Sequence, residues 1–94
     1  MAAELKTVHL IVKGTVQGIG FRFYTRRLGA GLGLRGLVRN LDNGDVEIEA
    51  EGDKQILQEF INALRSGDMA GYIDDMQSDW PPYQDKYHDF TIDF

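Results

Sequence analysis

A predicted β-hairpin in the middle of the chain constrains the fold most. Residues 34–41 and 45–51 read as two strands, joined by Asp42, Asn43 and Gly44. Asn-Gly readily adopts the positive φ angles of a type I′ turn, so we expect the strands to be antiparallel neighbours. In the second strand, apolar residues alternate with glutamates, which predicts one buried face and one face in water. The alternating residues are Val46, Ile48 and Ala50 against Glu47, Glu49 and Glu51.

The residues before this hairpin predict a strand followed by a helix. Apolar residues alternate over positions 8–12, and Gly14 closes that strand. After a loop that contains glycines, residues 21–32 show helical spacing, and we expect Gly33 to stop this helix. Gly29 lies inside the helix and should weaken it by about 1 kcal/mol relative to alanine.

A second helix follows the hairpin. Asp53 is a plausible N-cap, and the helix should end near Gly67. Between them lies an apolar stripe of helical spacing, which should face the core. The stripe consists of Ile56, Leu57, Phe60, Ile61 and Leu64.

The remaining residues predict two more strands. In residues 72–80, Ile73 and Met76 are three positions apart, which breaks strict alternation and indicates a bulge. Residues 90–94 alternate again and give a short final strand. The element order is β-α-β-β-α-β plus one extra strand at the C-terminal side. This order predicts a ferredoxin-like α+β sandwich, with two helices on one face of a mostly antiparallel sheet.

The bulk composition narrows the function classes. The chain has 94 residues, so we expect residues 1–94 to form a single domain. It has no Cys, which excludes disulfides, thiolate catalysis and Cys-ligated metals. No stretch is apolar enough for a signal peptide or a membrane span, so we expect no membrane association and a cytoplasmic location.

The charge is unevenly distributed. The net charge of −5 argues against nucleic acid as a partner, because binding a phosphate backbone needs a basic surface. Residues 13–39 nevertheless hold six of the ten basic residues and no Asp or Glu, which leaves a charge of −11 for the rest (4 − 15). A local positive field in an acidic protein can focus a small anion. The six are Lys13, Arg22, Arg26, Arg27, Arg35 and Arg39, of which we expect Arg22 to act on a ligand and Arg26, Arg27 and Arg35 to solvate the surface.

The loop between the first strand and the first helix is a candidate anion site. Unpaired backbone N–H groups converge at such a helix start, and the helix dipole adds partial positive charge. Gly18 and Gly20 let the backbone approach a ligand, and Arg22 could fork onto two phosphate oxygens. Many strand-to-helix turns contain glycine for steric reasons alone. The loop by itself is therefore compatible with an anion site and with a purely structural turn. The loop comprises Thr15, Val16, Gln17, Gly18, Ile19, Gly20 and Phe21.

Asn40 is the second candidate. Residues two apart on a strand share a face, so Asn40 should point the same way as Val38, toward the helices if Val38 is in the core. There it could hold a water beside the phosphate loop. Alternatively, Asn40 caps the turn through its own backbone. The residues themselves do not decide between these two roles.

Both segments carry a resemblance to one family. The stretch from Gly14 to Arg22 resembles the first acylphosphatase signature, and the stretch from Gly36 to Val46, followed by Gly52, resembles the second. Their order and separation are those of the family, and the element order matches from about residue 7 to residue 94. The matching residues are Gly14-x-Val16-Gln17-Gly18-Ile19-x-Phe21-Arg22 and Gly36-x-Val38-Arg39-Asn40-x-x-x-Gly44-x-Val46.

The resemblance implies an enzyme that hydrolyses small acyl phosphates to a carboxylate and inorganic phosphate. It implies that Arg22 binds the phosphoryl group, that Asn40 positions the attacking water, and that the amides of residues 15–21 cradle the phosphate. The chain departs from the family at Leu37, where an aromatic residue is usual, at Gly29, where alanine is usual, and at Gly67-Asp68, where Gly-Pro is common. We expect these departures to alter packing or substrate contact and to spare the chemistry.

The remaining expectations concern cofactors and partners. His9 and His88 are isolated, so we expect neither a metal site nor a catalytic histidine, and no cofactor. A non-catalytic anion-binding or regulatory module of the same fold is the alternative function. A nucleic-acid-binding module is a further rival, but glutamates on the open sheet face would repel phosphates. A monomer is the default oligomeric state.

Overall fold

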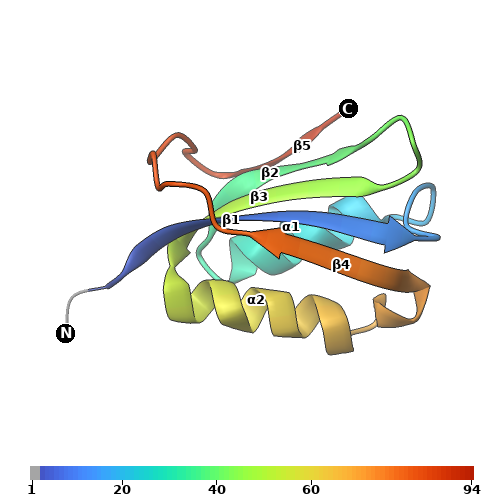
Figure 1. Ribbon diagram of the computed structural model, residues 1–94, viewed down its shortest axis with the longest axis horizontal. Helices are drawn as coiled ribbons and strands as arrows, with labels where there is room; N and C mark the ends of the chain where they lie inside the picture. Colours follow the sequence, from blue (N-terminus) through green and yellow to red (C-terminus); the bar gives the residue numbers. More distant parts are fainter. Residues whose placement is uncertain (1–2) are drawn as a thin grey trace.

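The computed structural model describes residues 3–94, and residues 1 and 2 lie outside the described part. Five strands form one mixed sheet in the order β4-β1-β3-β2-β5 (Figure 1). Neighbouring strands are antiparallel except β2 and β5, which are parallel. The predicted ferredoxin-like sandwich is therefore confirmed. The strands are β1 (Leu5–Gly14), β2 (Arg35–Asn40), β3 (Val46–Asp53), β4 (Ile73–Asp79) and β5 (Phe90–Asp93).

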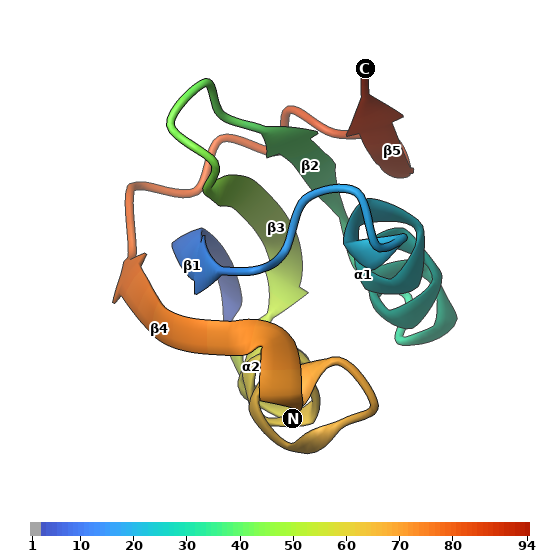
Figure 2. The ribbon, with the colours of Figure 1, turned by 90° about the vertical axis from the view of Figure 1, so that its right-hand side faces the viewer.

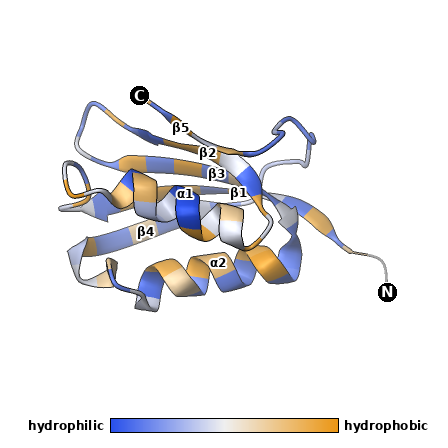
Figure 3. Cartoon of the chain, turned by 180° about the vertical axis from the view of Figure 1, so that it is seen from behind, coloured by the Kyte–Doolittle hydropathy of each residue, from blue (hydrophilic) through white to orange (hydrophobic). Residues whose placement is uncertain are grey.

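Two helices cover one face of this sheet. They are α1 (Phe21–Gly31) and α2 (Lys54–Ser66), and a short 3-10 turn, η1 (Ala70–Tyr72), leads into β4. Figure 2 shows α1 beside β2 and β5, and Figure 3 shows both helices in front of the sheet, with apolar and polar residues interleaved along α2. Within residues 3–94, no helix is long and apolar enough to cross a membrane.

The helix boundaries follow the predicted capping residues. The Asp53 carboxylate accepts a hydrogen bond from the N–H of Gln55 at 2.8 Å and caps α2. At the end of α1, Gly33 has a φ of +76°. The N–H of Leu34 donates to the carbonyl of Gly29 at 2.9 Å, as in a Schellman motif. Both predicted boundaries are confirmed.

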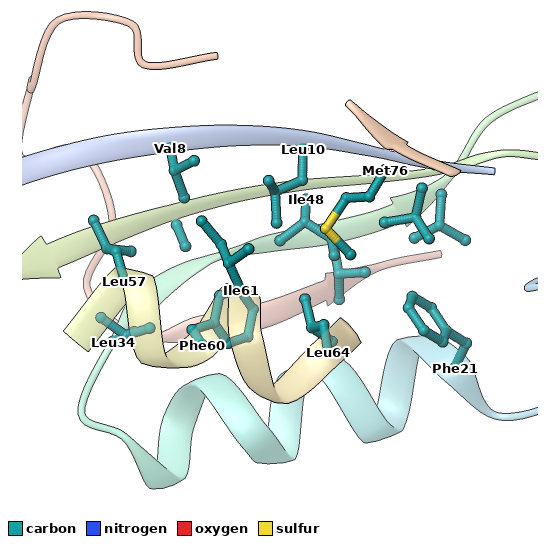
Figure 4. Packing of buried hydrophobic residues seen from close by; sticks show 14 of the residues in the cluster. Val8, Leu10, Phe21, Leu34, Ile48, Leu57, Phe60, Ile61, Leu64 and Met76 are labelled. Carbon is teal, nitrogen blue, oxygen red and sulfur yellow. The ribbon is translucent and has the colours of Figure 1, made fainter. Parts of the chain in front are cut away.

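The core lies between the helices and the sheet. The apolar stripe of α2 packs against alternate residues of β1 and β3, and Phe21 joins it from the start of α1 (Figure 4). Gly29 is buried because the ring of Phe90 lies over it; a Cβ at Gly29 would come 2.5 Å from that ring. Phe90 in turn lies against Phe60, with ring centroids 5.8 Å apart. The glycine that weakens α1 therefore makes room for a core aromatic of β5.

The connection between β2 and β3 differs from the predicted type I′ turn. That turn needs positive φ at both central residues, but Gly44 has a φ of +96° and Asn43 does not have a positive φ. The N–H of Gly44 donates to the carbonyl of Leu41 at 3.2 Å, and the N–H of Leu41 donates to the carbonyl of Asp45 at 2.8 Å. The side chain of Asn43 stabilises this longer loop through the N–H of Asp45, so glycine supplies the positive φ alone.

The expected bulge occurs in β4. Lys13 of β1 pairs with Asp75, whereas Gly14 pairs with Ile73, so Asp74 is the extra residue. The extra residue brings Ile73 and Met76 to the same, core-facing side despite their odd spacing.

The sheet face opposite the helices is less open than the alternation of glutamates predicts. Glu51 is only 1% exposed. Its carboxylate accepts hydrogen bonds from the Thr7 hydroxyl at 3.0 Å and from the N–H groups of Lys86 and Tyr87 at 3.0 and 3.3 Å. Arg35, predicted to solvate the surface, donates to Asp85 at 2.7 Å. The segment between β4 and β5 therefore lies over this face and buries the glutamate.

Candidate active site

The loop between β1 and α1 lies at the same end of the molecule as the β2–β3 hairpin and the end of β5 (Figure 1). Its two ends are anchored, because Val16 and Phe21 are each 1% exposed and belong to the core. Between these anchors, Gly18 and Gly20 have φ angles of +79° and +84°, and the space a Cβ would occupy at either is open. The glycines therefore serve the backbone conformation and leave the loop accessible to a ligand.

The amide groups of this loop are unpaired along most of its length. The N–H groups from Val16 to Phe21 have no hydrogen-bond acceptor within residues 3–94. Thr15 is different, because its N–H donates to the carbonyl of Tyr72 at 2.9 Å. No side chain caps the start of α1, and its first turn has no acidic residue. Unsatisfied donors and the positive end of the helix dipole thus coincide, which favours an anion.

Arg22 lies in the first turn of α1 and is held from the side of β5. Its Nη1 donates to the carbonyl of Asp93 at a long 3.5 Å, and its guanidinium carbon lies 5.0 Å from the ring centroid of Phe94. Among the ion pairs of residues 3–94, none involves Arg22. Its charge is therefore not neutralised by a carboxylate, which leaves the guanidinium free to pair with an anionic ligand.

Asn40 is the last residue of β2 and pairs with Val46 of β3. It lies two residues after Val38, which is fully buried beneath the helices, as the spacing predicts. The Oδ1 atom of Asn40 is buried and has no hydrogen-bond partner within the described chain. The alternative in which Asn40 caps the turn through its own backbone gains no support, because its Oδ1 accepts no hydrogen bond from the backbone of residues 3–94. A buried carboxamide oxygen without a partner can accept a hydrogen bond from a water.

Two contacts bring these parts together. The side chain of Gln17 donates to the carbonyls of Leu41 and Asp45, at 2.7 and 2.8 Å. On the other side of Asn40, its neighbour Arg39 pairs with Asp93 of β5, whose carbonyl Arg22 approaches. The loop, Arg22 and Asn40 thus lie at one end of the sheet, and the β2–β3 hairpin and the end of β5 connect them.

A depression of about 270 Å³ on the opposite sheet face is a different feature. Its charged groups pair with each other, with Arg39 Nε 2.6 Å from Glu47 and Lys86 Nζ 2.7 Å from Glu49. Burial raises the pKa of Glu47, but its hydrogen bonds with His9 and Arg39 outweigh this and lower it overall. Because these carboxylates are ionised and already paired, the depression offers no free charge to an anion. It is lined by His9, Leu37, Arg39, Glu47, Glu49, Lys86 and Tyr87.

This placement of Leu37 bears on a departure from the expected family pattern. Leu37 lines the depression on the sheet face away from the helices, whereas Asn40 and Val38 belong to the helix-facing side. The missing aromatic residue therefore affects packing on that far face and lies away from the loop and Arg22.

Sequence reasoning missed two contributors to this region. The contacts of Asp93 and Phe94 with Arg22 depend on the parallel pairing of β5 with β2, which the alternation of residues 90–94 does not reveal. The hydrogen bonds of the Gln17 side chain are the second contribution, since the glycine-rich pattern of the loop indicates a role for its backbone amides only. A polar, uncharged side chain of that length next to the buried Val16 is the signal that could have indicated such a role.

Comparison with known proteins gives a consistent result. A family model described as Acylphosphatase matches residues 8–92. A curated acylphosphatase of Dehalococcoides mccartyi is 48% identical over 83 residues, which covers 87% of this chain and 91% of the relative. An acylphosphatase of Thermotoga petrophila is 39% identical over 90 residues, covering 96% of this chain and 99% of the relative. The crystal structure of acylphosphatase from Bacillus subtilis superposes with a TM-score of 0.87 at 34% identity, covering 97% of this chain and all of that one.

Proposed function

The chain belongs to the acylphosphatase family, and from this premise we propose how its residues hydrolyse the carboxyl-phosphate bond of small acyl phosphates. The proposal assigns the phosphoryl group to the loop amides and Arg22, and the attacking water to Asn40. One observation carries it. Unpaired amides, an arginine without a carboxylate partner and a buried amide oxygen without a partner lie at the same end of the sheet.

The loop and Arg22 bind the phosphoryl group. The free N–H groups from Val16 to Phe21 donate to its oxygens, and the Arg22 guanidinium adds a full positive charge and a planar pair of donors. Thr15 belongs to the loop but does not donate its N–H to the phosphoryl group, because the carbonyl of Tyr72 already accepts that hydrogen bond. These donors are fixed before the substrate arrives, because Val16 and Phe21 anchor the loop in the core. Preorganised donors of this kind stabilise charge in a transition state without further reorganisation.

Asn40 holds the attacking water through its Oδ1 atom. The water oxygen forms a bond to phosphorus in line with the bond to the carboxylate oxygen, which breaks. The carboxamide is too weak a base to remove the water's proton, so that proton passes to a phosphoryl oxygen of the substrate. The products are a carboxylate and inorganic phosphate. Because a carboxylate is a weak base, it leaves without a general acid, and the protein supplies positioning and charge stabilisation.

Two substitutions separate these roles. Arg22→Ala should abolish both hydrolysis of an aromatic acyl phosphate and binding of inorganic phosphate, measured by spectrophotometry and calorimetry. Asn40→Ala should retain phosphate binding and lose turnover by about 10²-fold or more. Asn43→Ala is the matched control, since it removes an amide three residues further along the same hairpin, where it caps the loop. This control should lower stability and keep kcat.

Assays of the wild-type protein distinguish the proposed enzyme from the alternative, a non-catalytic module. If the wild-type protein bound phosphate but did not turn over the acyl phosphate in the presence of a chelator, a non-catalytic anion-binding module would be the better description. Near-normal hydrolysis by Asn40→Ala would overturn the role assigned to that side chain.

We also propose that the protein acts as a monomer in the cytoplasm, without nucleic acid as a partner. The exposed edge strand β4 carries Asp74, Asp75 and Asp79, and charges on an edge oppose pairing with a second sheet. Light scattering that gave a dimer mass, or fractionation that placed the protein elsewhere, would contradict this.

A further inference from the structure

We propose that the side chain of Gln17 is a positioning residue, which holds the end of β2 at the distance from the phosphate loop that Asn40 needs. The inference rests on the proposed function, because it acts through the water held by Asn40. In the proposed chemistry, Gln17 contributes its backbone N–H to the phosphoryl group. Its side-chain carboxamide contacts neither the phosphoryl group nor the water.

The geometry is that of a clamp between two segments. Nε2 of Gln17 carries two hydrogens, and the two acceptors are the carbonyls of Leu41 and Asp45 at 2.7 and 2.8 Å. Leu41 directly follows Asn40 in the chain. Within residues 3–94, these are the only hydrogen bonds between the loop 15–20 and the hairpin turn 41–45.

The place of the clamp explains what it controls. The ladder between β2 and β3 ends with the pair of Asn40 and Val46, and the N–H of Leu41 donates to the Asp45 carbonyl at 2.8 Å. Gln17 binds the same Asp45 carbonyl and the carbonyl of Leu41, so it fixes both sides of the turn immediately beyond Asn40. Without this clamp, the hairpin end would keep its own strands and the ion pair of Asp45 with Lys13 of β1, at 3.0 Å, but no hydrogen bond to the loop 15–20.

The rest of the loop cannot take over this function. Val16 and Phe21 anchor the loop toward the core, and the glycines at 18 and 20 carry no side chain. The phosphate-binding amides and the water-binding amide oxygen therefore belong to two segments, and within residues 3–94 Gln17 supplies the hydrogen bonds that join the loop itself to the hairpin turn. Misplacement of a reacting group by about 1 Å can cost about 10²-fold in rate.

A purely structural role would give a different result. If Gln17 only stabilised the fold, its loss would lower the unfolding temperature and leave the kinetics of the folded enzyme unchanged. A positioning role lowers kcat and leaves inorganic phosphate binding nearly intact, because the loop amides and Arg22 remain. Gln17→Met tests this, since methionine has a similar length and no N–H donor.

The experiment measures kcat, the Kd of inorganic phosphate and the unfolding temperature for Gln17→Met, Asn40→Ala and the double variant. We expect Gln17→Met to lower kcat by about 10- to 100-fold with little change in the phosphate Kd. In the Asn40→Ala background the same change should cost little further kcat, since there is no positioned water left to misplace. Asp53→Ala is the stability control: it removes the cap of α2, far from this end of the sheet, and should keep kcat.

Each outcome decides the proposal. A Gln17→Met enzyme with wild-type kcat, or a full additional loss in the Asn40→Ala background, would overturn the positioning role. Should Gln17→Met fail to fold, Gln17→Asn carries the same comparison, because its shorter side chain keeps the amide but cannot span both carbonyls. Failure of the proposed function looks different: the wild-type protein would then lack turnover, or Asn40→Ala would keep it.

Discussion

The guanidinium carbon of Arg22 lies 5.0 Å from the ring centroid of Phe94. The same ring lies 6.0 Å, centroid to centroid, from Phe23, the residue after Arg22 in α1. The last residue of the chain is thereby packed against the first turn of α1, although its side chain is 85% exposed. This contact restricts the rotamers of the arginine to which we assign phosphate binding.

Replacing Phe94 should therefore weaken phosphate binding without affecting the water. An exposed cation–π contact contributes about 0.5–1 kcal/mol, so Phe94→Leu should raise the Kd of phosphate about two- to fivefold. Phe94→Tyr keeps a ring face and serves as the control. Calorimetry with inorganic phosphate measures both. Equal affinities for wild type and Phe94→Leu would show that the ring does not hold Arg22.

Gly29 and Gly31 offer a matched test of packing in α1. A Cβ at Gly29 would lie 2.5 Å from the Phe90 ring, whereas a Cβ at Gly31 meets nothing within 4 Å. Gly29→Ala should therefore destabilise the protein by about 1–3 kcal/mol, despite the better helix propensity of alanine. Gly31→Ala should stabilise it by up to about 1 kcal/mol. Urea unfolding gives both values.

A second substitution identifies the cause. Phe90→Leu should make Gly29→Ala less harmful, because the smaller side chain leaves space for the new methyl group. If Gly29→Ala cost the same in both backgrounds, the ring would not be the origin of the strain. We therefore expect the ring of Phe90, from β5, to disfavour alanine at position 29 of α1.

The sequence predicts most of this fold because its signals are local. Alternation in β1 and β3, the stripe of α2 and the capping residues Asp53 and Gly33 each reflect a backbone geometry that tertiary contacts did not override. The predicted type I′ turn is wrong, because the Asn-Gly pair also fits other loops. In this loop, of the two residues, only Gly44 has a positive φ. The burial of Glu51 was missed because it depends on a segment 35 residues further along the chain.

The candidate site was predictable to a smaller extent. The loop, Arg22 and Asn40 follow from their motifs, and the free amides agree with the predicted anion site except at Thr15. The sequence does not reveal the unpartnered oxygen of Asn40 or the hydrogen bonds of the Gln17 side chain, since both depend on how the loop packs against the hairpin.

Glu51 should be essential for stability. Its removal in Glu51→Ala leaves the Thr7 hydroxyl and the N–H groups of Lys86 and Tyr87 without their acceptor. We expect a loss of about 2–5 kcal/mol in the free energy of unfolding. Glu59→Ala on the exposed side of α2 is the control and should change stability by about 0.5 kcal/mol or less. Equal effects of the two substitutions would contradict a structural role for the Glu51 carboxylate.

The pH dependence of stability should reveal the contacts of His9. Its Nε2 lies 2.8 Å from Glu47 and its Nδ1 lies 2.9 Å from Asp79. Burial lowers the pKa of His9, but the hydrogen bonds to both carboxylates outweigh it and raise the pKa above its usual 6.5. The charged imidazolium therefore stabilises the folded state fully below pH 6.5, and this contribution is lost as the pH rises through the raised pKa.

The carboxylate of Glu47 sets the lower pH limit of this stabilisation. The pKa of Glu47 is lowered overall from 4.5, so its contribution is present above that pH and is lost as the pH falls through the lowered value. Over the range from about pH 6 to alkaline pH, the stability difference between wild type and His9→Gln should thus be largest at the acid end and should shrink as the pH rises through the raised pKa of His9. Urea unfolding at both ends of this range measures it, and Asp79→Asn should retain part of the effect because Glu47 remains. Parallel stability curves for wild type and His9→Gln would show that the imidazole does not titrate with folding.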